Sequence, residues 1–279
     1  MSGHPVVACY RGLDSVDAVQ LGALLAGALH EPLVLASAYR YEPESLSARV
    51  LPPDNSRRAV AAQAALRRAR TFAGTDIEVR GQIVPSIGVA DALIALARDV
   101  DACVLVMGRD TQGHVTRSLI PRAPCPVAVA PLSVPLPQIG SFERIGVAYD
   151  GSPGAWWALH AARKLALATG ARLMLLAAGA TTEHAIGMLH VGRLSLGFKV
   201  EYDTRALVGE APAALAQASG ELDLLVCGSR GRGRPLAAIL GSVSTHLVAH
   251  AQCPVLVVPS VVRHSTTGPL GITSAAANA

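Results

Sequence analysis

A glycine-rich segment in the last third of the chain has the composition of a phosphate-binding loop. Residues 228–244 read GSRGRGRPLAAILGSVS and directly follow an aliphatic run at 222–227. Glycines let backbone N–H groups approach an anion closely, and a helix that starts at Gly241-Ser242 adds its dipole and its unpaired donors. Ser242 and Ser244 can donate hydroxyl hydrogen bonds to phosphate oxygens. The segment therefore predicts a cradle for phosphate groups.

Two familiar phosphate motifs do not fit this segment. A Walker A loop ends in Gly-Lys-Ser/Thr, and no lysine lies near 228–244. The dinucleotide fingerprint GxGxxG fails because Arg234-Pro235-Leu236 follows Gly231-Arg232-Gly233. A plain surface loop is the remaining alternative, but three glycines between a buried strand and a capped helix count against it. Arg230, Arg232 and Arg234 add positive potential, although some of them are expected to point to solvent.

The elements around this loop alternate between strands and helices. The sequence predicts strands at 144–149, 172–178, 199–207, 222–227 and 255–258, and helices from Ser152-Pro153 to Thr169-Gly170, at 211–219 and at about 242–249. Strand–helix alternation predicts an α/β fold with a parallel, doubly wound sheet. Ligands bind to such sheets beyond the carboxyl ends of the strands.

The chain also repeats itself once. HPVVACYRG at 4–12 matches FERIGVAYDG at 142–151, CVLVMG at 103–108 matches DLLVCG at 223–228, and APCPVAVAP at 123–131 matches AQCPVLVVP at 251–259. The three pairs keep the same order, and each half has roughly 140 residues, a normal domain size. A proline-rich stretch at 131–137 lies between them. The expected division is a first domain at 1–133, a linker at 134–141, a second domain at 142–260 and a flexible tail at 261–279.

The second half resembles the universal stress protein family. The spacing of Gly228, Gly231, Gly241 and Ser242 is similar to the ATP-binding signature of that family, and so are the strand end Tyr149-Asp150-Gly151-Ser152 and the closing strand at Cys253-Pro254-Val255. The resemblance covers both halves, from about His4 to Pro259. It implies two Rossmann-like, adenine-nucleotide-binding domains with five-stranded parallel sheets, which pair within the chain as a pseudo-dimer.

The resemblance also implies the site. Asp150 would face the ribose of ATP, and Ala178 would lie near the adenine. A Mg²⁺ ion would accompany the nucleotide. The complete set of residues expected around ATP is Ala148, Asp150, Ala178, Gly228, Ser229, Arg230, Gly231, Gly233, Gly241, Ser242, Val243 and Ser244. If the resemblance is set aside, the position of Asp150 beside Gly151 indicates a residue that forms the turn at the strand end.

The first half departs from this pattern. Arg11 stands where the second half has Asp150, and the loop after Gly108 reads RDTQGHVTRSLI, without paired glycines or a Gly-Ser helix start. The first half is therefore expected to bind ATP poorly or not at all. Its expected role is structural, with its last strand at 127–130 pairing with 255–258. Arg11 could instead bind a different anion, and the sequence leaves this open.

Composition limits the other classes of function. The net charge is only +4, and a helical cluster of arginines at 57–70 has no interleaved aromatic residues, so nucleic-acid binding is not expected. Five cysteines form no CxxC pair, and neither a signal peptide nor a membrane span is recognisable, so we expect a cytoplasmic protein. His246 and His250 have metal-ligand spacing but lack a third ligand. Trp156 and Trp157 are expected to pack.

Three functions remain open from the sequence. The leading hypothesis is a nucleotide-binding regulatory protein of the stress response, with an unknown protein partner and possible further homodimerisation. The second is a slow ATP-hydrolysing or nucleotide-transforming enzyme, for which no catalytic residue is evident. The third is an interaction scaffold with both pockets empty.

Overall fold

The computed structural model describes residues 3–42, 54–109, 114–131, 142–196, 200–229, 240–259, 267–268 and 272–273. The first half, up to residue 131, contains β1 (Val6–Cys9), α1 (Val16–Leu29), β2 (Leu33–Arg40), α2 (Asn55–Arg70), β3 (Val79–Ser86), α3 (Val89–Asp99), β4 (Val104–Gly108), α4 (His114–Leu119) and β5 (Val127–Ala130). The second half contains β6 (Arg144–Ala148), α5 (Pro153–Thr169), β7 (Arg172–Gly179), α6 (Thr182–Leu196), β8 (Tyr202–Val208), α7 (Ala211–Ala218), β9 (Leu224–Gly228), α8 (Ser242–His250) and β10 (Val255–Val258). Short 3₁₀ turns are η1 (Leu13–Ser15), η2 (Ile120–Arg122) and η3 (Ser219–Glu221).

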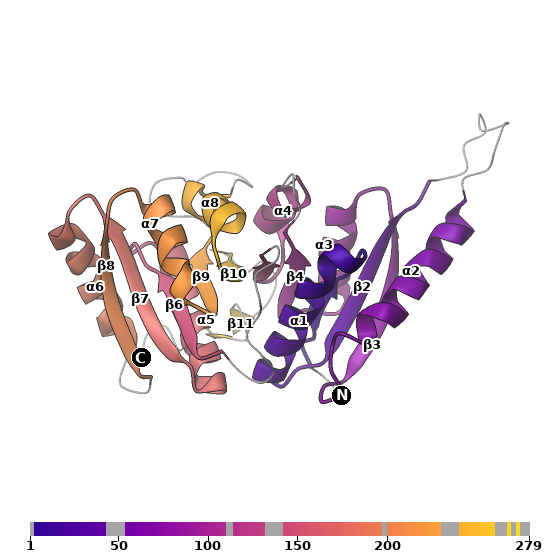
Figure 1. Ribbon diagram of the computed structural model, residues 1–279, viewed down its shortest axis with the longest axis horizontal. Coiled ribbons are helices and arrows are strands. Elements are labelled where there is room, and N and C mark those ends of the chain that lie inside the picture. Colours follow the sequence, from indigo (N-terminus) through magenta and orange to yellow (C-terminus); the bar gives the residue numbers. More distant parts are fainter. Residues whose placement is uncertain are drawn as a thin grey trace.

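A single ten-stranded sheet runs through the molecule, as Figure 1 shows. Its order is β3-β2-β1-β4-β5-β10-β9-β6-β7-β8, so each half contributes five strands arranged in the same way. All neighbours are parallel except β5 and β10, which pair antiparallel with Leu256 opposite Ala128. This confirms the predicted α/β fold and the predicted pairing of the two closing strands.

Helices cover both faces of the sheet. Buried residues of α1, α2, α5 and α6 form one apolar cluster, while those of α3, α4, α7 and α8 form the other. Successive residues of a strand belong to opposite clusters, as Val6 and Val7 in β1 do. Both clusters include residues of both halves. Two-sided burial explains why the strands read as continuous aliphatic runs.

Helix α5 begins and ends where its sequence predicts. Ser152 precedes it and its Oγ accepts a hydrogen bond from the N–H of Ala155 at 3.1 Å, with Pro153 in the first helical position. Gly170 ends the helix in the left-handed conformation, with φ of 74°.

Other boundaries differ from the prediction. Helix α6 was not predicted, and β8 begins at Tyr202 rather than at Lys199, which lies outside the described residues. The predicted linker at 134–141 is also outside them. Of the predicted tail, the described residues pair antiparallel as β11 (Thr267–Gly268) and β12 (Ile272–Thr273). Among the described residues, no helix is both long enough and apolar enough to cross a membrane.

Candidate functional site

The predicted site residues that the structure describes lie where the chain reverses its winding direction in the second half. Strands β6 and β9 are neighbours, and the chain leaves β6 toward β7 but leaves β9 toward β10, on the other side. Such a switch point opens a crevice beyond the carboxyl ends of the two strands. Asp150 follows β6 and Ser229 follows β9, so both lie at the carboxyl ends of these two strands.

Asp150 is fixed by the turn between β6 and α5. Its Oδ1 accepts a hydrogen bond from the N–H of Ser152 at 2.9 Å, and the N–H of the preceding Tyr149 donates to the carbonyl oxygen of Leu176 at 2.8 Å. The Asp150 side chain is half-buried at the edge of the sheet. The turn between β6 and α5 thus orients the Asp150 side chain, as its position beside Gly151 suggests.

Two small residues lie at the same edge. Ala148 ends β6 and is 9% exposed, while Ala178 is half-buried near the end of β7, opposite Leu207 of β8. Both positions therefore carry small side chains at or near the carboxyl ends of their strands.

The two ends of the glycine-rich loop are held together by Ser229. Its carbonyl oxygen accepts hydrogen bonds from the N–H of Gly241 at 2.9 Å and from the Oγ of Ser244 at 3.2 Å. Its own N–H donates to the carbonyl oxygen of Val258 at 2.8 Å, which fixes it to β10. The start of α8 is thereby placed beside the end of β9. Arg230, Gly231 and Gly233 belong to the part of the loop outside the described residues.

The serines at the start of α8 differ in position. Ser242 is exposed and Val243 is half-buried, so the first backbone N–H groups of the helix lie at its accessible end. Ser244 is 1% exposed, and its hydroxyl also contacts the carbonyl oxygen of Gly241 at 3.1 Å. In this structure the Ser244 hydroxyl supports the base of the loop, whereas the sequence predicts that it donates to phosphate.

Gly228 has a packing role that the sequence does not reveal. A Cβ at this position would lie 2.6 Å from the carbonyl carbon of Gly154 and 2.8 Å from its oxygen, in the first turn of α5. Real side chains do not tolerate such approaches to backbone atoms. The two glycines, Gly228 and Gly154, therefore let the end of β9 lie close to the first turn of α5.

The thiols near the strands are not poised for chemistry. Burial raises the pKa of Cys227, which precedes Gly228, to about 12, and burial raises the pKa of Cys9 to about 11 despite the nearby charge of Arg11. Such thiols stay neutral and unreactive at pH 7. No group of three His, Cys, Asp or Glu side chains within the described ranges is arranged to hold a metal ion.

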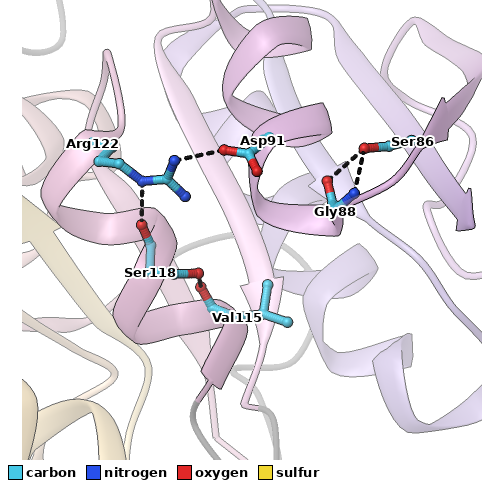
Figure 2. Close-up of polar contacts among 6 residues, drawn as sticks. All are labelled: Ser86, Gly88, Asp91, Val115, Ser118 and Arg122. Atoms are coloured by element: carbon cyan, nitrogen blue, oxygen red, sulfur yellow. Dashed lines mark hydrogen bonds and ion pairs between the residues drawn. The ribbon is translucent and has the colours of Figure 1, made fainter.

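The equivalent corner of the first half carries arginines. Arg11 follows β1 and Arg109 follows β4, at the places of Asp150 and Ser229. Figure 2 shows that α4 and η2 are attached to α3 here: Arg122 pairs with Asp91 and donates through Nε to the carbonyl oxygen of Ser118 at 2.7 Å. Ser86 caps the backbone of Gly88 just before α3. The first half has no acidic residue at the place of Asp150, where Arg11 stands, and no Gly-Ser pair at the start of α4.

Comparison with known proteins places the chain in one family. The model of the universal stress protein family matches residues 195–259. A universal stress protein of Thermus aquaticus, encoded beside a sulfhydrylase, is 37% identical over 135 residues, which cover 98% of that protein and 42% of this chain. Universal stress protein Rv2005c of Mycobacterium tuberculosis is 29% identical over 230 residues, covering 77% of that protein and 73% of this chain.

A solved structure shares the whole fold. The universal stress protein from Archaeoglobus fulgidus DSM 4304 superposes with a TM-score of 0.73 and covers 94% of this chain and 100% of its own, at 16% identity. The repeated sequence motifs, the fold and the Thermus relative agree. This chain belongs to the universal stress protein family.

Proposed function

We propose that the second half of this chain binds ATP and that occupancy of this site regulates a response to stress. The observation that supports the proposal best is the closure at Ser229, whose carbonyl oxygen joins the end of β9 to the start of α8. This closure puts an exposed helix N-terminus at a switch point of the sheet, where anions and nucleotides are favoured.

Each described residue then has a distinct part. The carboxylate of Asp150 accepts hydrogen bonds from ribose hydroxyls, and Ala148 and Ala178 border the adenine. The backbone N–H groups of Ser242 and Val243 donate to phosphate oxygens, together with the exposed Ser242 hydroxyl, while the N–H of Gly241 stays bound to the carbonyl oxygen of Ser229. Gly228, Ser229 and Ser244 shape the crevice from below. Arg230, Gly231 and Gly233, outside the described residues, complete the loop.

Mg²⁺ fits this arrangement as a companion of the nucleotide. Protein-bound Mg²⁺ commonly keeps several waters and uses one or two carboxylates together with substrate phosphates. Asp150 is assigned to the ribose here, so the ion would be held by phosphate oxygens and waters. The bound ion would neutralise phosphate charge, and no separate protein cage is required.

A regulatory role accounts for the site better than rapid turnover. The chain has no lysine in the loop of the kind that fast NTPases use, and Asp150 is already employed in orientation and binding. A slow ATP-hydrolysing or nucleotide-transforming enzyme is the alternative. We place the protein in the cytoplasm, where ATP and a regulatory protein partner would be available.

Calorimetry with ATP and Mg²⁺ tests the proposal. We expect one site per chain, lost in a Gly231→Val/Gly241→Val double variant. Gly187→Val is the control, because a Cβ at this position on α6 would meet nothing within 4 Å. Absence of binding by the unmodified protein would contradict the proposal and favour a scaffold. Product analysis after long incubation with ATP separates regulation from turnover.

A further inference from the structure

The last strands are not the only link between the two halves. Arg109, the residue after β4, donates through Nη2 to the carbonyl oxygen of Ala251 at 2.8 Å, across 142 positions of sequence. Ala251 is the C-cap residue directly after α8, with an extended backbone, and it is 2% exposed. An arginine of the first half therefore binds the C-terminal end of the helix whose other end forms the candidate phosphate site. Figure 1 shows α8 beside the boundary between the halves, at the same end of the sheet as α4.

The chemistry of this contact suits a helix end. The last carbonyl groups of an α-helix lack partners within the helix and carry its partial negative charge, which a guanidinium stabilises. The N–H of Ala251 donates back to Leu247 at 2.8 Å, so the final turn is closed. The bridge is part of the folded core rather than a loose surface contact, because its acceptor lies on a buried residue.

Burying the Arg109 guanidinium at this place costs free energy of desolvation. Its N–H donates to the carbonyl oxygen of Ala130 in β5 at 3.0 Å, which fixes its backbone to the sheet. Burial lowers the pKa of its guanidinium, and its Nε is buried without a hydrogen-bond partner among the described residues. An arginine without a structural role would extend its guanidinium into water. This one is kept partly dehydrated, with its charge directed at α8.

Both ends of α8 are consequently fixed. At its start, Gly241 and Ser244 bind the carbonyl oxygen of Ser229 in the second half. At its end, Ala251 binds Arg109 of the first half. A helix of nine residues is a short rigid rod of about 13 Å, so the position of its end determines the direction of its start.

We propose that Arg109 is a positioning residue for the nucleotide site of the other half, acting through α8. This inference rests on the proposed ATP site and gives the first half a part in it. The link has one direction, because Ser229 occupies the equivalent place in the second half and a serine side chain is far too short to make the reciprocal bridge.

Amide hydrogen exchange and calorimetry on the full chain test this role. In Arg109→Met we expect faster exchange of the amides at 242–251 without nucleotide, and an affinity for ATP with Mg²⁺ about fivefold lower, the size expected from a charge at a helix end. Arg109→Lys, which keeps the charge, should recover part of both. Arg122→Met is the matched control, since Arg122 binds Asp91 and Ser118 within the first half.

Each result has a definite reading. Unchanged exchange at 242–251 in Arg109→Met overturns the inference, and so does unchanged affinity in a protein that binds ATP. Equal effects in Arg122→Met overturn it too, because they would reflect a general loosening of the first half. If the unmodified chain binds no ATP, the proposed function fails, while the exchange measurement still decides whether Arg109 holds α8.

Discussion

Gly228 and Gly108 occupy the same place in the two halves, each as the last residue of a buried strand. Their surroundings differ. A Cβ on Gly228 would collide with the backbone of Gly154, whereas a Cβ on Gly108 would lie 3.5 Å from the nearest atom, the carbonyl oxygen of Asp14, which is an ordinary contact. The glycine of the second half is required by packing, and the glycine of the first half is not.

Alanine substitution should separate the two positions. Gly228→Ala is expected to lower the free energy of unfolding by about 1–3 kcal/mol, because the backbone of α5 must move away from β9. Urea denaturation measures this, with Gly108→Ala as the matched control. Equal stability of the two variants would show that the close approach at Gly154 is not required.

Single residues also show where sequence reasoning stops. The helix start at Gly241-Ser242 was found from turn chemistry and Asp150 from the resemblance to the family, and both lie beside the strands of the switch point. The buried position of Ser244 was missed because Ser242 and Ser244 look alike in a loop. Arg109 was missed because its partner is 142 positions away, and no local pattern encodes such a contact.

Among the elements, α1 and α5 are equivalent helices that end differently. Both ends need a left-handed residue: α5 has Gly170 with φ of 74°, and α1 has His30 with φ of 57°. A side chain in this conformation is strained, and glycine is not.

Exchanging the residue types should therefore act in opposite directions. His30→Gly is expected to raise the free energy of unfolding by roughly 0.5–1 kcal/mol, and Gly170→Ala to lower it by about 1 kcal/mol. Chemical denaturation of both variants beside the unmodified chain provides the check. A loss of stability in His30→Gly would mean that contacts of the imidazole outweigh the backbone strain.

Local signals explain which elements were predictable. Helix α5 has Ser152-Pro153 at its start and Gly170 at its end, so its bounds followed from capping rules. Helix α6 has Gly187 and Gly192 in its interior, which weakens its helical pattern. Packing favours glycine at position 192, because a Cβ there would lie only 2.9 Å from Leu175 and 3.1 Å from Tyr149. This reason is visible only in the folded structure.

At the scale of the whole molecule, the shared sheet and the shared apolar clusters couple the halves. Leu105 of β4 is fully buried, and its cluster contains Leu225 and Val257 of the second half. Both tryptophans of the chain, Trp156 and Trp157, are on α5, so their fluorescence reports on the surroundings of a helix of the second half.

A destabilising substitution in the first half should therefore also lower the stability of the second half. Leu105→Ala is expected to cost about 2–5 kcal/mol and to move the tryptophan transition in urea together with the circular dichroism transition. Val60→Ala on α2, at a side chain that is 64% exposed, should leave both where they are. A tryptophan transition that stays at its original midpoint in Leu105→Ala would mean that the halves unfold independently.

Joining the halves covalently also removes a conflict that a pair of identical subunits would face. In a symmetric dimer, one codon sets the residue after the fourth strand of both subunits, so an arginine that braces the neighbouring helix would also stand at the mouth of that subunit's own phosphate loop. Here separate codons encode the two copies of this position, Arg109 in the first half and Ser229 in the second. The tandem arrangement thus lets the proposed bracing by Arg109 and the proposed nucleotide binding change independently of each other.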